Sequence, residues 1–263
     1  MIAIRWSVSI LAAACFIGCD DQKPTPDNVD KKPDVPVVVN SGKGDDPTRV
    51  ATGAAVIGKA TFEGTPPKPK AISMAVAPQC AAMHANPIFE EVIVVGAAGE
   101  LKNVVVYVKD GARLGGAAPT TPVILDQQGC IYTPHVVTVM VGQDLKAKNS
   151  DGFLHNVHGL CKENPEFNIP QQQKNQINKL DATQAPETFL VKCDIHPWMN
   201  AWVVVLDHPF SAVSGEDGTF AIKGLKDGKY TLVAWHQKLG TQEAEIEVKN
   251  GKATADFKFA PKK

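Results

Sequence analysis

Short runs in which apolar and polar residues alternate recur along the chain from Ala51 onward, separated by turn-forming residues. Successive side chains of a β-strand point to opposite faces, so these runs favour strands. Helical periodicity is weak, and only residues 74–85 and 174–180 could each hold a turn or two of helix. Regular short strands predict an all-β fold of sandwiches. The expected strands are residues 55–62, 91–95, 103–108, 136–141, 187–193, 201–206, 219–222, 230–235, 244–248 and 253–259.

Two Asp-Gly turns, at Asp217-Gly218 and Asp227-Gly228, divide the C-terminal part of the chain into strand-like runs. Asp-Gly supplies the positive φ that tight hairpins need. Together with residues 58–64 and 103–108, this part resembles the transthyretin-like regulatory domain found beside carboxypeptidases. The resemblance implies a small, discontinuous β-sandwich with a scaffolding role. It would consist of residues 51–117 and 210–263, with residues 118–209 inserted between them.

The first 18 residues have the features of an export signal. Arg5 precedes an apolar run over residues 6–17, and Gly18-Cys19 follows it. The run is too short to span a bilayer of about 30 Å as a helix. The segment resembles a bacterial lipoprotein signal, which implies acylation of Cys19 and a membrane-anchored protein of the cell envelope or periplasm. The alternative is an ordinary secretory signal with Cys15 and Cys19 idle. Either interpretation permits disulfides downstream.

The charge balance argues against a nucleic-acid partner, and the Pro and Asp content of residues 20–50 argues against a folded segment there. The chain has 263 residues with 27 basic and 28 acidic side chains, a formal net charge of −1. Proteins that bind nucleic acid need surplus Lys and Arg to displace counterions, so we expect no such partner. Residues 20–50 contain five Pro, seven Asp and no aromatic residue. This composition cannot bury enough apolar surface to fold, and residues 19–50 are expected to be a disordered tether.

Cysteine, histidine and methionine converge in two short segments of the region 118–209. His155 lies in Leu154-His155-Asn156-Val157-His158, between expected strands. Cys193 follows 38 residues later, with His196 and Met199 at successive spacings of three. A thiolate, two imidazoles and a thioether are the donor set of a blue copper centre. Zinc could use the same Cys and His, but methionine is a poor ligand for it.

These residues resemble the cupredoxin family, in particular its amicyanin and plastocyanin group, over roughly residues 122–209. Tyr132-Thr133-Pro134, Val141-Gly142, Asn149 and the short loop from Cys to Met support the resemblance. It implies a Greek-key sandwich with one type 1 copper ion. His155, Cys193 and His196 would be the equatorial ligands and Met199 the axial one. The backbone around Asn156 would donate a hydrogen bond toward the Cys193 sulfur, and His158 would not be a ligand.

The same resemblance implies a carrier of single electrons rather than an enzyme. Electrons would pass through the solvent-side edge of His196, and Pro197 and Trp198 would form an apolar docking patch. The expected partner is a periplasmic dehydrogenase, cytochrome or oxidase. Ile195 stands where the family usually has Pro, and Asp194 beside the thiolate is unusual, so the redox potential stays open. Two alternatives remain: a copper-binding or sequestering envelope lipoprotein without a redox partner, and a purely adhesive or structural β-sandwich protein whose cysteines pair.

The remaining cysteines and histidines leave two pairings open. A Cys80–Cys130 disulfide would close a loop of about 50 residues and stabilise the fold by roughly 4 kcal/mol in the chain-entropy model. The alternative is a second metal site of Cys80, His84, Cys130 and His135. Cys161 would be free, or would pair with Cys80 or Cys130 instead. His208 and His236 are expected to be structural, and the chain shows no catalytic triad, phosphate loop or paired-carboxylate motif.

Overall fold

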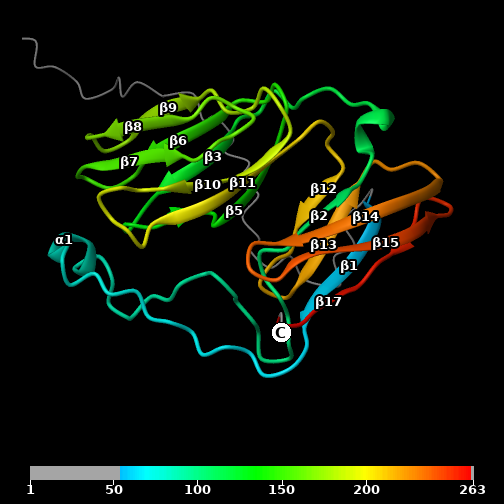
Figure 1. Ribbon diagram of the computed structural model, residues 1–263, viewed down its shortest axis with the longest axis horizontal. Coiled ribbons are helices and arrows are strands. Elements are labelled where there is room, and N and C mark those ends of the chain that lie inside the picture. Colours follow the sequence, from blue (N-terminus) through cyan, green and yellow to red (C-terminus); the bar gives the residue numbers. More distant parts are fainter. Residues whose placement is uncertain (1–53, 262–263) are drawn as a thin grey trace, which may run out of the picture. The chain divides into compact units, whose positions relative to one another are not determined.

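The computed structural model describes residues 54–261, and the predicted signal, tether and Cys19 lie outside this range. Seventeen strands and two short helical turns lie within it, which confirms the predicted all-β fold (Figure 1). The strands form four sheets, and two hydrophobic cores divide them into two sandwiches. Within residues 54–261 no helix has both the length and the apolar character to cross a membrane.

One sandwich occupies residues 123–206, and we call it the inserted sandwich. Its first sheet has the strand order β5-β11-β10-β7-β8 and its second β4-β3-β6-β9. Alternating burial along its strands places apolar residues such as Leu145 and Ala147 inside and Lys146 and Lys148 nearer the solvent. Its strands are β3 (Val123–Gln127), β4 (Tyr132–Thr133), β5 (Val136–Met140), β6 (Leu145–Asn149), β7 (His155–Gly159), β8 (Phe167–Gln171), β9 (Gln176–Leu180), β10 (Glu187–Lys192) and β11 (Asn200–Leu206).

The other sandwich combines strands from both sides of the inserted one, and we call it the split sandwich. One sheet has the order β13-β1-β16, with β17 also on β1, and the other has the order β12-β2-β14-β15. Because β1 pairs with β13 and β2 with β14, segments far apart in sequence share each sheet. Its strands are β1 (Ala54–Phe62), β2 (Val105–Val108), β12 (Ser211–Val213), β13 (Thr219–Lys223), β14 (Gly228–His236), β15 (Gly240–Val248), β16 (Ala253–Thr254) and β17 (Phe257–Phe259).

The Asp217-Gly218 turn leads into β13 and requires its glycine. Gly218 has a φ of +73°, and an added Cβ would lie 2.5 Å from the Ala60 carbonyl oxygen. Asp217 Oδ1 accepts the Thr219 amide hydrogen at 2.9 Å and closes the turn. The turn therefore fits tightly against β1.

A long connection between β1 and β2 reaches the inserted sandwich. It carries the single-turn helix α1 (Pro78–Ala81), and Figure 1 shows α1 near one end of the inserted sandwich. Met74, Ala77 and Cys80 are buried in the core of that sandwich. A disulfide joins Cys80 to Cys130, which confirms the predicted pairing. The 3₁₀ turn η1 (Gly111–Leu114) follows β2.

Four expectations about local structure are wrong. Residues 91–95 form no strand, because their only ladder contact with another described residue is the bridge from Val95 to Leu101. Residues 176–180 form β9 rather than a helical turn, since alternating burial and pairing with β6 prevail. His155 begins β7 instead of lying between strands. The run 253–259 is interrupted at Ala255-Asp256, where Asp256 Oδ1 accepts the Lys59 amide hydrogen at 2.9 Å.

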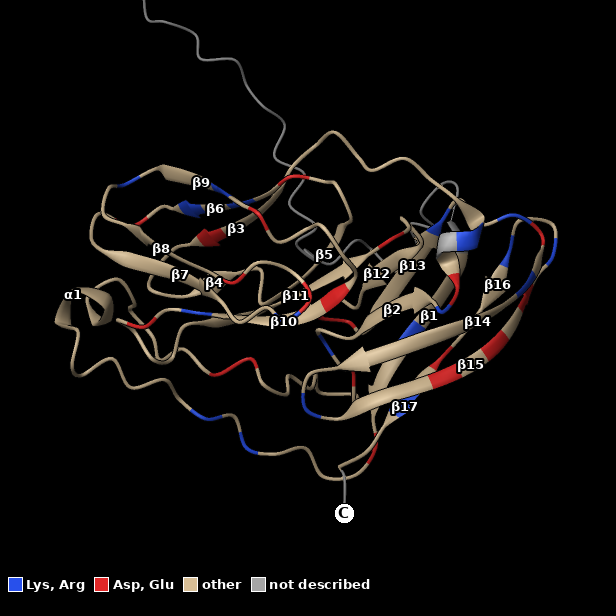
Figure 2. Cartoon of the chain, turned by 45° about the horizontal axis from the view of Figure 1, so that its top comes forward, with Lys and Arg blue, Asp and Glu red and all other residues tan. Residues whose placement is uncertain are grey.

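Charged side chains protect one edge of the split sandwich. Among the strands of residues 54–261, β15 pairs only with β14, so its outer side is an edge of the described sheet. Glu243, Glu245 and Glu247 alternate along it as exposed residues, and Figure 2 shows the acidic positions on β15. Repeated charge on an edge strand disfavours pairing with another chain.

Candidate metal centre

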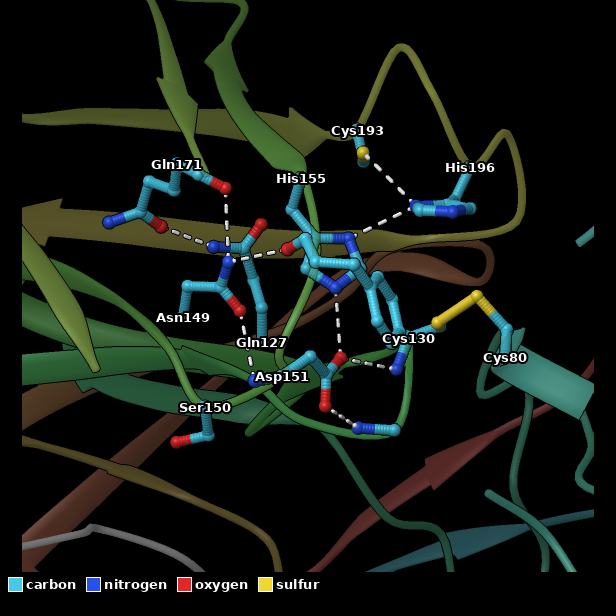
Figure 3. Close-up of polar contacts among 12 residues, drawn as sticks. Cys80, Gln127, Cys130, Asn149, Ser150, Asp151, His155, Gln171, Cys193 and His196 are labelled. Carbon is cyan, nitrogen blue, oxygen red and sulfur yellow. Dashed lines mark hydrogen bonds and ion pairs between the residues drawn. A yellow bond between two sulfur atoms is a disulfide. The ribbon is translucent and has the colours of Figure 1, made fainter. Parts of the chain in front are cut away.

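Three potential ligands meet at one end of the inserted sandwich (Figure 3). Cys193 directly follows β10, and His196 and Met199 lie in the turn that leads to β11. The Cys193 amide donates to the Met199 carbonyl oxygen at 3.1 Å, and the Met199 amide donates to the His196 carbonyl oxygen at 2.9 Å. His155 enters from β7, which is antiparallel to β10. The predicted spacing therefore forms a closed loop against the strand that carries the first histidine.

Their ligand atoms face one another in the protein interior. His155 Nδ1 lies 3.0 Å from His196 Nδ1, and Cys193 Sγ lies 3.8 Å from His196 Nδ1. One ligand atom each of His155, Cys193 and His196 lies within 4.8 Å of the others. Met199 is fully buried in the same core. Two imidazole nitrogens and a sulfur at this separation fit a copper ion held by nitrogen and soft sulfur donors.

The surroundings of Cys193 favour its thiolate form. Burial raises the pKa of the thiol. The hydrogen bonds with His155 and with the amides of Asn156, His196 and Ile195 lower the pKa by more than burial raises it, so it lies below its ordinary value. The Asn156 amide is thus one of the groups that lower this pKa, as expected. The Asn156 side chain acts differently, because its Oδ1 accepts from the Cys193 thiol at 3.3 Å and from the Asp194 amide at 2.7 Å. A thiolate is the form of cysteine that binds metal.

Asp151, which the sequence reasoning missed, orients His155. Its Oδ2 lies 2.8 Å from His155 Nε2 and also accepts the Cys130 amide hydrogen at 2.9 Å, while its Oδ1 accepts that of Gly129 at 2.8 Å. An ionised carboxylate only accepts, so Nε2 carries the proton and Nδ1 presents its lone pair toward Cys193 and His196. The signal in the sequence is an acid four residues before the histidine.

The charges of this pair support each other. Burial raises the pKa of Asp151, but the hydrogen bonds from His155 and the Cys130 and Gly129 amides lower it below its usual range. Burial lowers the pKa of His155, but hydrogen bonds with Asp151 and Cys193 raise it above the ordinary value. The fold thus keeps a carboxylate against the outer nitrogen of the candidate ligand.

His196 has no solvent-side edge, contrary to the expectation. The residue is only 2% exposed. Both sulfurs of the Cys80–Cys130 disulfide lie within 4.8 Å of one of its ring nitrogens, and the rings of Phe153 and Trp198 flank it. Burial and the neighbouring His155 lower the pKa of His196. Cys80, on the long connection between β1 and β2, supplies part of this cover, and Cys130, Phe153 and Trp198 of the inserted sandwich supply the rest.

The expected docking patch is partly turned inward. Pro197 is exposed, but Trp198 is half-buried and its Nε1–H donates to the Cys130 carbonyl oxygen at 2.9 Å. Ile195 adds an exposed apolar side chain to the same loop. An apolar surface of Ile195 and Pro197 therefore remains beside the candidate ligands.

His158 and Asp194 contact each other and further polar side chains of the protein. His158 Nδ1 lies 2.9 Å from Asp194 Oδ2, and His158 Nε2 lies 3.1 Å from Glu166 Oε1. The Lys192 ammonium is the main cause of a lowered pKa for Asp194, with further hydrogen bonds from His158, Asn168 and Asn156. Both residues belong to a polar network beside the candidate ligands.

The disulfide removes the thiols that the alternative second metal site would need. His84 Nε2 lies 2.7 Å from the Gly129 carbonyl oxygen, and His135 Nδ1 lies 3.2 Å from that of Asn200. These two histidines therefore serve as hydrogen-bonding groups. Cys161 is a free, half-buried thiol, and burial together with Glu187 and Glu166 raises its pKa to about 12.

Comparison with known proteins gives neighbours only among solved structures. No protein-family model matches this chain, and no curated protein matches it. The chain is similar to a copper-containing nitrite reductase from Thermus scotoductus (22% identity over 37% of this chain and 26% of that chain, TM-score 0.30). It is also similar to a mutant of amicyanin, with 23% identity over 38% of this chain and 98% of that chain and a TM-score of 0.30. A purple cupredoxin from Nitrosopumilus maritimus is similar at 19% identity over 32% of this chain and 98% of that chain, with a TM-score of 0.28.

The chain thus spans about a quarter of the nitrite reductase and nearly the whole of the two cupredoxins. At these identities and TM-scores the likenesses carry no argument about function. The chemistry of the centre is therefore taken from its own side chains.

Proposed function

We propose that His155, Cys193 and His196, with Met199 as a fourth donor, hold one type 1 copper ion, and that the protein transfers single electrons. The observation that carries this proposal is the convergence of two Nδ1 atoms and a thiolate-favouring sulfur within 4.8 Å in the interior. A bound copper ion would supply one-electron chemistry by alternating between Cu(II) and Cu(I). A set of four protein donors favours electron transfer over chemistry on a bound substrate.

The residues around the ligands support this use by limiting their movement. Asp151 holds a proton on His155 Nε2, so Nδ1 is the nitrogen that faces the other donors, and the carboxylate increases its basicity as a ligand. The hydrogen bonds between Cys193, His196 and Met199 fix the ligand loop to the ends of β10 and β11. Phe153 and Trp198 pack beside His196 and limit access of water. A preorganised ligand set changes little between two oxidation states.

The wider setting is part of the proposal and depends on the sequence. The chain would be an exported lipoprotein, anchored to a membrane through Cys19. Its redox partner would be an exported dehydrogenase, cytochrome or oxidase that docks on Ile195, Pro197 and Trp198. The split sandwich, with its resemblance to a transthyretin-like domain over residues 51–117 and 210–263, would serve as a scaffold.

Burial of His196 favours a second candidate function, copper sequestration. A ligand that solvent does not reach would retain its ion, and such a protein would need no partner. Voltammetry of the copper-loaded, full-length chain separates the two functions. A carrier should give one reversible one-electron wave that repeats without loss of copper. Bound copper that gives no reversible wave would contradict the carrier and favour sequestration.

A further inference from the structure

A second group of soft ligands lies against His196. Cys80 Sγ, Cys130 Sγ and a ring nitrogen of His196 lie within 4.8 Å of one another, and all three residues are buried. In Figure 3, Cys193 lies above His196 and the disulfide lies below it. The imidazole is thus shared by two sets of sulfur atoms, one from the ligand loop and one from the disulfide.

We propose that Cys80, Cys130 and His196 form a separate Cu(I) site when the two cysteines are thiols. Two thiolates and an imidazole are soft and borderline donors, and thiolates select Cu(I). In the disulfide the sulfurs are bonded to each other and are no longer thiolates, so the site exists in one redox state of the pair. The site uses neither Cys193 nor His155, and it does not rest on the proposed electron-transfer function.

The dithiol form arises in two ways. The chain is synthesised with Cys80 and Cys130 as thiols, before oxidation joins them. A dithiol reductant can also reopen the bond by thiol–disulfide exchange. One reductant thiolate attacks a sulfur of the pair and breaks the S–S bond, and its second thiol resolves the mixed disulfide. Two electrons and two protons then reside on Cys80 and Cys130, and the reductant leaves as a disulfide.

Contacts other than the S–S bond hold both cysteines near His196. The Cys130 amide donates to Asp151 Oδ2 at 2.9 Å, and its carbonyl oxygen accepts Trp198 Nε1–H at 2.9 Å. The Cys80 amide donates to the Ala77 carbonyl oxygen at 2.9 Å within α1. Met74, Ala77 and Cys80 also belong to the buried core of the inserted sandwich. Opening the bond therefore leaves both sulfurs within reach of one ion.

The shared imidazole makes the two sites dependent on each other. An ion bound by Cys80, Cys130 and His196 competes for the ligand that the proposed type 1 centre needs. The reverse exchange, in which a disulfide oxidant takes up the two electrons and two protons and leaves as a dithiol, removes two of the three donors and returns His196 to that centre. The redox state of Cys80 and Cys130 thus determines which set of sulfurs His196 serves.

The test uses the full-length chain with Cys161→Ser and Cys193→Ser, so that the proposed type 1 centre is absent. The protein is reduced by a phosphine without oxygen, the phosphine is removed, and Cu(I) is titrated against a chromogenic Cu(I) chelator. We expect one more Cu(I) per chain than in the same variant with its disulfide intact. Equal Cu(I) uptake by the reduced and oxidised forms overturns the proposal.

Matched variants identify the ligands. Adding Cys80→Ser and Cys130→Ser should remove the extra equivalent, and Cys15 and Cys19 are common to all variants. Adding His196→Asn instead should lower the affinity for that Cu(I) by about tenfold or more, whereas His208→Asn, another buried histidine, should not. An affinity that His196→Asn leaves unchanged contradicts the role of the shared imidazole.

A second measurement does not depend on folding of the chains that lack Cys80 and Cys130. Cu(I) should protect Cys80 and Cys130 of the reduced Cys161→Ser, Cys193→Ser chain from alkylation by iodoacetamide, as read by mass spectrometry. Alkylation of both thiols at the same rate with and without Cu(I) would contradict the site. Because this chain lacks Cys193, its result does not depend on whether the proposed type 1 centre exists, so failure of one proposal can be told from failure of the other.

Discussion

Two fully buried histidines, one in each sandwich, differ in what their nitrogens contact. His155 of the inserted sandwich has Asp151 on Nε2 and His196 on Nδ1. His236 of the split sandwich accepts the amide hydrogens of Lys238 and Leu239 on Nδ1. Its Nε2 has no hydrogen-bond partner among the described residues. His155 thus has the contacts of a candidate metal ligand, and His236 does not.

The pKa values of the two histidines move in opposite directions. Hydrogen bonds with Asp151 and Cys193 outweigh burial at His155 and raise its pKa. Burial, with a smaller effect of His135, lowers the pKa of His236 to about 4. The ring of Phe259 lies 6.1 Å from that of His236. The split sandwich therefore uses its buried histidine as a neutral packing group.

The largest expected effect on stability comes from removing the Cys80–Cys130 disulfide, which lies beside the candidate metal centre. The paired substitutions Cys80→Ser and Cys130→Ser open a loop with a sequence separation of 50. They should lower the free energy of unfolding by about 4 kcal/mol in the chain-entropy model, measured by urea denaturation of the copper-free chain. Cys161→Ser is the control, since Cys161 is not in a disulfide. Equal stability of both proteins would show that the disulfide does not stabilise this region.

The second prediction concerns His236 and acid. Its folded pKa of about 4 is lower than the ordinary value of 6.5, so between these values the unfolded chain binds the proton and the folded chain does not. Stability should therefore fall as the pH falls from about 6.5 to 4, by about 3 kcal/mol from this group.

Urea denaturation at pH 7 and pH 4 checks this effect against His236→Gln, which keeps a side chain that can accept the local amides. The difference in stability between the two pH values should be smaller in the variant. The same difference in both proteins would mean that His236 is not a buried neutral group in the folded chain.

The third prediction concerns Asp151, whose carboxylate contacts His155 Nε2. His236 Nε2 has no such partner among the described residues. Asp151→Asn removes the charge that holds the proton on His155 Nε2, and the affinity for Cu(II) should fall by about 10–100-fold, or roughly 1.4–2.7 kcal/mol. A competition titration with a metal chelator measures the change. Asp181→Asn, at an exposed position, should leave the affinity unaltered. An unchanged affinity in Asp151→Asn would remove the distinction drawn between His155 and His236.

The smallest expected effect is that of Trp198, which bonds the ligand loop to Cys130. Trp198→Phe leaves the Cys130 carbonyl oxygen without the indole donor, at a cost of about 1 kcal/mol in the free energy of unfolding. Trp202→Phe is the matched variant, since Trp202 packs on Trp235 and no hydrogen bond of its indole occurs within residues 54–261. Equal losses in the two variants would mean that only ring volume matters at Trp198.

The sequence pattern predicts the all-β fold and the disulfide. The groups that surround the candidate ligands could not be predicted, because they come from segments far apart in the sequence. The function of Asp151 depends on the amides of Gly129 and Cys130, more than 20 residues away. Part of the cover over His196, at Cys80, comes from a connection whose residues show no strand or long helix, so no local pattern marks it. At residues 176–180 tertiary pairing with β6 prevailed over a weak helical preference.

The most direct test of the metal centre is addition of one equivalent of Cu(II) to the full-length chain, followed by visible absorption spectroscopy. Binding by Cys193, His155 and His196 predicts an intense thiolate-to-copper absorption that saturates at one ion per chain. The absorption should persist in Cys161→Ser and vanish in Cys193→Ser. A chain that gives no intense absorption, or one whose absorption survives in Cys193→Ser, would contradict the central claim.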